Sequence, residues 1–135
     1  MIHIRDIDHI VLRVDDLSAA LRFYQTVLGC RLERERPDIG LYQLRAGRSM
    51  IDLVLVDSEL GRGGGPAPGK DAHNMDHLCL RVEPFDAEAI AAHLRAHGID
   101  PGKVAMRYGA EGEGPSMYIN DSQGNTIELK GPPVH

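Results

Sequence analysis

Two parts of the chain carry the same sequence pattern, and this internal repeat constrains the fold more than any other feature. The segment DHIVLRV at residues 8–14 returns as DHLCLRV at residues 76–82, with five of the seven positions identical. The copies are 68 residues apart (76 − 8), about half of the 135-residue chain. A shorter pair follows in the same order, IDL at 51–53 and IEL at 127–129. Repetition at a fixed spacing indicates two copies of one structural unit.

Each half of the chain predicts the same order of elements: a strand, a helix and three further strands. In the first half we expect strands at 7–14, 30–36, 39–45 and 50–56, and a helix from Leu17 to Leu28 that ends at Gly29. In the second half we expect strands at 77–82, 103–108, 116–120 and 126–130, and a helix that begins after Asp86 and ends at Gly98. The sequence therefore predicts an α+β fold of two βαβββ modules, with module one at 1–57, a linker at 58–74 and module two at 75–135.

Charge and composition exclude several classes of function. The net charge is −5 with both signs interspersed, so no basic surface is available for nucleic acid or anionic lipid. The apolar runs are strand-sized, well short of the ~20 residues that a membrane span needs, and the N-terminus has no signal-peptide core. Two cysteines, Cys30 and Cys79, do not make a disulfide framework, so the expected location is the cytoplasm. We expect Cys79 to be a small buried thiol.

Alternation along the strands predicts that four polar side chains lie on the sheet faces that the helices do not cover. The apolar stripe of each helix needs an apolar sheet face, so His9 and His77 should point away from it. Asp52 and Glu128 follow the same rule in the closing strands. A buried carboxylate is costly unless it is paired or bound to a metal, and two imidazoles with two carboxylates suit a divalent metal. We therefore predict a shared metal site.

Each of these residues has an ordinary interpretation when it is taken alone. A single strand histidine is usually a satisfied or partly exposed side chain, and Asp52 alone would be a charge on a solvated face. The repeat of the histidine–carboxylate pair favours the metal site. His93 and His97 lie four residues apart on the second helix, and we expect them on its solvated face because no third ligand is obvious nearby. We expect Tyr118 in the core.

Two glycine-rich stretches have simpler interpretations. Residues 61–74 are rich in glycine and proline and predict an exposed linker. The cluster at 61–65 is no phosphate-binding loop, because no Lys-Ser or Lys-Thr pair and no helix follow it. Residues 109–114 predict either a loop over a site or a long hairpin.

The residues described above resemble the vicinal oxygen chelate superfamily, which includes glyoxalase I, bleomycin-resistance proteins, fosfomycin-resistance enzymes and type I extradiol dioxygenases. The resemblance rests on segments 7–14, 23–29, 76–78 and 120–129, which together span nearly the whole chain. It implies two βαβββ modules that form a U-shaped, metal-lined cleft.

The resemblance also implies individual roles. His9 matches the first-strand ligand of the family, His77 the second histidine and Glu128 the last-strand glutamate. Asp52 falls where glyoxalase I carries a glutamate that binds the metal and moves the substrate proton. The aspartate is one methylene shorter, which leaves open whether it is a ligand, a base or neither. Chains of this length in the family are usually homodimers, which implies that His9 and Asp52 come from one chain and His77 and Glu128 from the other.

The activity that the resemblance implies is a glyoxalase I-like lyase or isomerase reaction on a small substrate with vicinal oxygens. Glu128 or Asp52 would move the proton, and one divalent metal (Zn, Ni, Co, Mn or Fe(II)) would act as a Lewis acid. Glutathione or another thiol is a candidate co-substrate. We expect no nucleic-acid or membrane partner.

Three alternative functions stay open. An extradiol-type ring-cleaving dioxygenase would need only His9, His77 and Glu128 as iron ligands, with Tyr118 as a candidate hydrogen-bond donor. A fosfomycin-type thiol transferase would need positively charged side chains to bind a phosphonate, and the candidates are Lys103, Arg107 and Lys130. A drug-binding protein of the bleomycin-resistance kind would bind its ligand without a metal.

Overall fold

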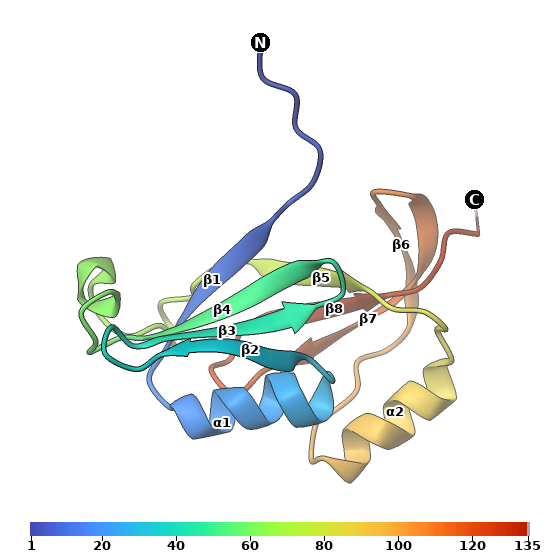
Figure 1. Ribbon diagram of the computed structural model, residues 1–135. Helices are drawn as coiled ribbons and strands as arrows, with labels where there is room; N and C mark the ends of the chain where they lie inside the picture. The colour runs from blue at the N-terminus through green and yellow to red at the C-terminus, as the bar shows by residue number, and fades with distance from the viewer. Residues whose placement is uncertain (135) are drawn as a thin grey trace. The chain divides into compact units, whose positions relative to one another are not determined.

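The computed structural model describes residues 1–134, and the chain divides into two compact units. The first unit is Met1–Asn74 and the second begins at Met75. Each unit contains one four-stranded sheet and one main helix (Figure 1). The predicted α+β class and the repeated βαβββ order are confirmed.

The first unit builds its sheet in an order that places its first and last strands side by side. Its elements are β1 His9–Val14, α1 Leu17–Leu21, a π-helical segment η1 Arg22–Val27, β2 Arg31–Arg36, β3 Leu41–Ala46, β4 Ser49–Leu55 and a 3-10 turn η2 Gly61–Gly64. The strand order is β1-β4-β3-β2, with β1 parallel to β4 and the other pairs antiparallel.

The first helix begins as predicted and then widens. Asp16 caps α1 by accepting a hydrogen bond from the backbone N–H of Ala19. The expected α-helix continues as η1, which contains the adjacent residues Phe23 and Tyr24, 3% and 0% exposed. Successive residues of an α-helix point about 100° apart, so a wider turn helps both rings to reach the core.

No helix in residues 1–134 is long and apolar enough to span a membrane.

The second unit repeats this plan. Its elements are β5 His77–Arg81, α2 Ala87–Ala96, β6 Ala105–Gly109, β7 Gly112–Asn120 and β8 Thr126–Lys130. The strand order is β5-β8-β7-β6, again with the first and last strands parallel neighbours. Only two residues separate β6 from β7, so the stretch 109–114 is a tight hairpin and not a loop over a site. Gly29 and Gly98 follow the two helices with φ of +76° and +74°, the left-handed conformation that glycine adopts most readily.

Alternate residues of each sheet form its buried face. In the first unit the residues at most 2% exposed on this face include Leu12, Val14, Leu44, Ile51 and Leu53. In the second unit those at most 4% exposed include Met117, Ile119, Ile127 and Leu129, together with Leu94 of α2. Figure 1 shows α1 lying along the first sheet.

Two side chains that the sequence analysis placed in the core lie elsewhere. The prediction that Cys79 is buried is wrong, because the residue is exposed. Tyr118 is 37% exposed. Both lie opposite Glu128 on its neighbouring strands, and side chains of paired residues project from the same face of a sheet. Their strand positions therefore give them the face of Glu128.

The glycine-rich segment after β4 is fixed by an arginine of β1. Arg13 donates hydrogen bonds to the backbone carbonyl oxygens of Gly61, Gly64, Gly65 and Pro66. A phosphate-binding loop presents backbone N–H groups to its ligand, whereas this segment presents carbonyl oxygens to the guanidinium of Arg13. The segment is therefore a structural turn attached to β1.

Candidate metal centre

Strand pairing gives each unit one histidine and one carboxylate in the same relation. Asp52 of β4 is paired with Val11, which lies two residues after His9 in β1. Glu128 of β8 is paired with Cys79, which lies two residues after His77 in β5. Residues two apart in a strand share a face, and so do paired residues of neighbouring strands. We call His9 with Asp52 the first half-site, and His77 with Glu128 the second half-site.

A neighbouring carboxylate orients the imidazole of the first half-site. His9 Nδ1 lies 2.7 Å from Asp8 Oδ2. When neutral His9 donates its Nδ1–H to Asp8, the Nε2 lone pair is left to bind a metal. The hydrogen bond to Asp8, followed by the negative charge of Asp52, raises the pKa of His9 above its usual value. A histidine whose second nitrogen is held by a carboxylate is the usual arrangement of a metal ligand.

The carboxylate of the first half-site is buried with one oxygen unsatisfied. Asp52 is 3% exposed. Its Oδ2 accepts a hydrogen bond from Gln43 Nε2 at 3.1 Å. Its Oδ1 is buried and has no hydrogen-bond partner among residues 1–134. A buried acceptor without a donor costs about 1–3 kcal/mol, and more when it is charged. A cation at Oδ1 would remove this cost, so the residues present fit a metal.

The second half-site has the same oriented imidazole and a closer carboxylate. His77 Nδ1 lies 2.6 Å from Asp76 Oδ1. His77 Nε2 lies 3.3 Å from Oε1 of Glu128, a residue that is 5% exposed. Two ligands with bonds of about 2.0–2.1 Å to one tetrahedral ion would be roughly 3.3 Å apart. The separation of these two atoms therefore fits a pair of ligands to one ion.

Two further residues flank the half-sites. The sequence analysis did not identify Gln43, and it considered Tyr118 only for the dioxygenase alternative. Gln43 of β3 lies opposite Asp52, and Tyr118 of β7 lies opposite Glu128. The Tyr118 ring meets the His77 ring edge to face at 5.5 Å between centroids, and the Arg107 guanidinium lies 4.3 Å from the Tyr118 centroid. Counting residues outward from the two hairpin turns would have found both positions, because each turn fixes the register of its strands.

The structure divides the predicted ligand set into two pairs. In the part of the chain that the structure describes, neither unit contains three or more His, Cys, Asp or Glu side chains placed to hold a metal ion. Each unit supplies one imidazole and one carboxylate, and donors of these types suit Zn, Ni, Co, Mn or Fe(II). A four-ligand centre needs both pairs.

Other candidate groups have different surroundings. His93 of α2 and His97, the C-cap residue that follows α2, are exposed and contact each other at 4.8 Å between ring centroids, as expected for a solvated helix face. Although Cys79 as a whole is exposed, partial desolvation of its thiol, followed by the negative charge of Glu128, raises the pKa of the thiol to about 11. The thiolate is the nucleophilic form, so Cys79 is a weak nucleophile at neutral pH.

The chain is similar in sequence and in fold to several known proteins. The chain is 34% identical over 125 residues to virulence protein STM3117 of Salmonella typhimurium, covering 91% of this chain and 81% of that protein. The crystal structure of that protein is similar with a TM-score of 0.78 and 29% identity, covering 97% and 99% of the two chains.

A lactoylglutathione lyase from Agrobacterium tumefaciens has a TM-score of 0.68 and 26% identity, covering 93% of this chain and 92% of that chain. The family profile of the Glyoxalase/Bleomycin resistance protein/Dioxygenase superfamily matches residues 6–129, which include both half-sites. The chain therefore belongs to this superfamily.

Proposed function

We propose that the chain is a divalent-metal-dependent enzyme that carries out a glyoxalase I-like lyase or isomerase reaction. The proposed metal ligands are His9, Asp52, His77 and Glu128. The observation that carries the proposal is the buried Oδ1 of Asp52, which has no donor among the described residues and shares a sheet face with the oriented imidazole of His9. Membership of the superfamily and the likeness to a lactoylglutathione lyase support the class of reaction.

The proposed centre is completed by a second copy of the chain. Each half-site supplies two ligands, which is half of the set. In the proposed homodimer, the first half-site of one protomer and the second half-site of its partner hold one ion, and two such centres form in the dimer. We place this dimer in the cytoplasm, because both cysteines are free.

The proposed chemistry needs a Lewis acid and a base. A divalent cation bound by the four ligands would polarise two neighbouring oxygens of a small substrate. A carboxylate of the site then removes a proton from the adjacent carbon and returns it to the neighbouring carbon. We assign this transfer to Glu128, because Gln43 occupies Oδ2 of Asp52 and Oδ1 is its proposed ligand atom. Asp52 is the candidate base if Glu128 proves to be a ligand only.

Metal content tests the proposal. The purified protein and a metal-free sample reloaded with Ni, Zn, Mn or Fe(II) would be analysed for metal per chain after brief dialysis. We expect close to one equivalent per chain, and isomerase activity on a hemithioacetal substrate that depends on the metal. Glu128→Ala should abolish both, whereas His93→Ala, on the solvated face of α2, should leave both unchanged.

The results would also separate the alternatives. A chain that retains and reloads no metal would not be a metal enzyme, and small-molecule binding would replace the proposed activity. Selective retention of Fe(II) without isomerase activity would favour an extradiol-type oxygenase. Equal effects of Glu128→Ala and His93→Ala would contradict the assignment of the site.

A further inference from the structure

A chain of hydrogen bonds runs across three strands of the first sheet and ends at the candidate metal centre. Arg34 Nη1 of β2 donates to Gln43 Oε1 of β3 at 2.9 Å. Gln43 Nε2 donates in turn to Asp52 Oδ2 of β4 at 3.1 Å. Because a guanidinium only donates, Arg34 turns the amide oxygen towards itself and the amide N–H groups towards the carboxylate. The orientation of the Gln43 amide is thereby fixed at both ends.

An irregularity in β2 brings Arg34 to this position. Leu32 pairs with Leu44, but the next pair joins Arg34 to Gln43, so Glu33 is an extra residue in the ladder. In a regular ladder Glu33 would lie opposite Gln43. The Glu33 carboxylate would then accept a hydrogen bond from the Gln43 amide N–H group. The Gln43 amide oxygen would face the carboxylate of Asp52, so that two acceptors would oppose each other. The bulge places the guanidinium of Arg34, a donor, opposite Gln43 in place of the Glu33 carboxylate. Bulges near functional sites commonly re-aim side chains in this way.

The displaced carboxylate is held away from Gln43. Glu33 accepts hydrogen bonds from Arg31 Nη2 and Arg45 Nη2, each at 2.8 Å. The bonds to Arg45 and then Arg31 lower the pKa of Glu33 to about 2. Glu33 is therefore ionised and occupied at neutral pH, and it does not compete for the Gln43 amide.

In the described part of the second unit no such hydrogen-bond chain reaches the carboxylate, because Arg107 of β6 lies over the Tyr118 ring and donates to Ser116. Its β6–β7 ladder is regular, and Tyr118 occupies the position of Gln43. The Tyr118 ring packs edge to face against the His77 ring. The bulge and the hydrogen-bond chain are therefore not needed for the fold, since the same sheet forms without them. The bulge and the hydrogen-bond chain occur in the first unit, where the half-site carboxylate is Asp52, one methylene shorter than Glu128 of the second unit.

We propose that Arg34 and Gln43 are positioning residues of the metal centre. They hold Asp52 with Oδ2 engaged, so that Oδ1 alone is presented as a single-oxygen ligand. This inference rests on the proposed function, because it assigns a role towards the proposed metal. Outer residues that orient ligands typically change metal affinity by 10–100-fold.

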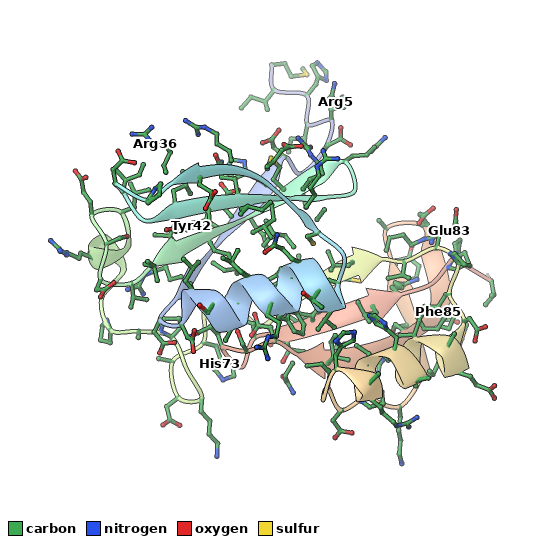
Figure 2. All side chains as sticks on the ribbon, turned by 60° about the horizontal axis from the view of Figure 1, so that its bottom comes forward. Arg5, Arg36, Tyr42, His73, Glu83 and Phe85 are labelled. Carbon is green, nitrogen blue, oxygen red and sulfur yellow. The ribbon has the colours of Figure 1, made fainter. Side chains whose placement is uncertain are left out.

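Titration of the metal-free protein with Zn²⁺ or Mn²⁺ alone, followed by calorimetry, tests the inference. Gln43→Leu, which keeps the size of the side chain and removes the donor, should weaken binding by about 10–100-fold. Arg34→Ala should weaken it by a smaller factor, about 2–10-fold, and Arg34→Lys should recover part of this loss. The matched control is Arg36→Ala, because Arg36 is the last residue of β2 (Figure 2) and its guanidinium donates to the carboxylate of Asp38.

The double variant separates a relay from a structural effect. If Arg34 acts through Gln43, adding Arg34→Ala to Gln43→Leu should cause no further loss. Additive losses would overturn the relay, and so would wild-type affinity in Gln43→Leu. If Gln43→Leu does not fold by circular dichroism, Gln43→Met removes the donor with a longer, flexible side chain.

The proposed function and this inference fail in different ways. If the wild-type chain binds no metal, the proposed function falls, and with it any positioning role towards a metal. If the wild-type chain binds metal and the Gln43 variants bind it equally well, only the positioning role falls. Thermal unfolding of the metal-free variants gives a second measurement of whether the effects of Arg34 and Gln43 are coupled.

Discussion

The two half-sites share a backbone plan and differ in the residue that lies across from the carboxylate. In the first half-site Gln43 lies there and donates a hydrogen bond to Asp52. In the second half-site Tyr118 lies there and packs against the imidazole of His77. The first unit therefore fixes its carboxylate through a neighbouring strand, whereas the second unit supports its histidine.

The comparison of the two half-sites shows which parts of the repeated module are constrained. The relation between histidine and carboxylate depends only on strand order and register, and it is the same in both units. The neighbouring side chains do not affect that relation, so they are free to differ. Two carboxylates with different surroundings are suited to different roles, which is the basis for proposing Asp52 as a ligand only and Glu128 as a ligand that also acts as the base.

The largest expected effect tests whether the two half-sites are equivalent towards the metal. His9→Ala and His77→Ala should each weaken metal binding by more than about 100-fold, because removing a ligand should cost more than removing the residue that orients it. Calorimetric titration of each variant measures this loss, and His97→Ala, at the exposed C-cap of α2, is the control. A large loss for one histidine and none for the other would mean that only one half-site binds the metal.

An intermediate effect tests the difference between Gln43 and Tyr118. The Tyr118 ring, and not its hydroxyl, makes the recorded contacts with His77 and Arg107. Tyr118→Phe should therefore change metal affinity by less than about twofold, while Tyr118→Ala should lower it several-fold because a ring contact contributes about 0.5–1.5 kcal/mol. The same titration compares the variants. A large loss in Tyr118→Phe would assign the hydroxyl a role that makes the two half-sites more alike.

The smallest expected effect concerns the bulge that only the first unit contains. Glu33 has a folded-state pKa of about 2, against an ordinary value of 4.5. A lowered carboxyl pKa stabilises the fold above the ordinary value, and the contribution is lost as the pH falls from about 4.5 towards 2. Glu33→Gln should therefore lower the Tm at pH 7, and the difference from wild type should shrink in that acidic range.

Thermal unfolding at a series of pH values measures this effect, with Glu35→Gln on the same strand as the control. A Tm difference that stays constant from pH 7 to pH 3 would mean that Glu33 acts through packing rather than through its charge.

Much of the fold and of the candidate site could be predicted from the sequence, because the strand period is a local signal and the repeat can be read directly by comparing the two halves of the chain. The face shared by His9 and Asp52 follows from alternation, and so does the face shared by His77 and Glu128. Alternation was applied less strictly to Cys79, whose small side chain suggested burial although its place between two leucines gives it the exposed face.

Other features could not be predicted because they depend on contacts between strands. The bulge at Glu33 requires the pairing partners of β2, which no local pattern identifies. The widened turn η1 depends on packing two adjacent rings against a sheet. The unsatisfied oxygen of Asp52 depends on which donors surround it once the strands have assembled.

The sequence by itself determined the repeated βαβββ plan and the four residues of the half-sites, because periodicity acts over a few residues and the repeat is visible when the two halves of the chain are aligned. The tertiary structure alone decided that Gln43 engages Asp52, that Tyr118 supports His77, and that Arg34 rather than Glu33 faces the amide. These outcomes depend on register between strands, which the chain sets by folding as a whole.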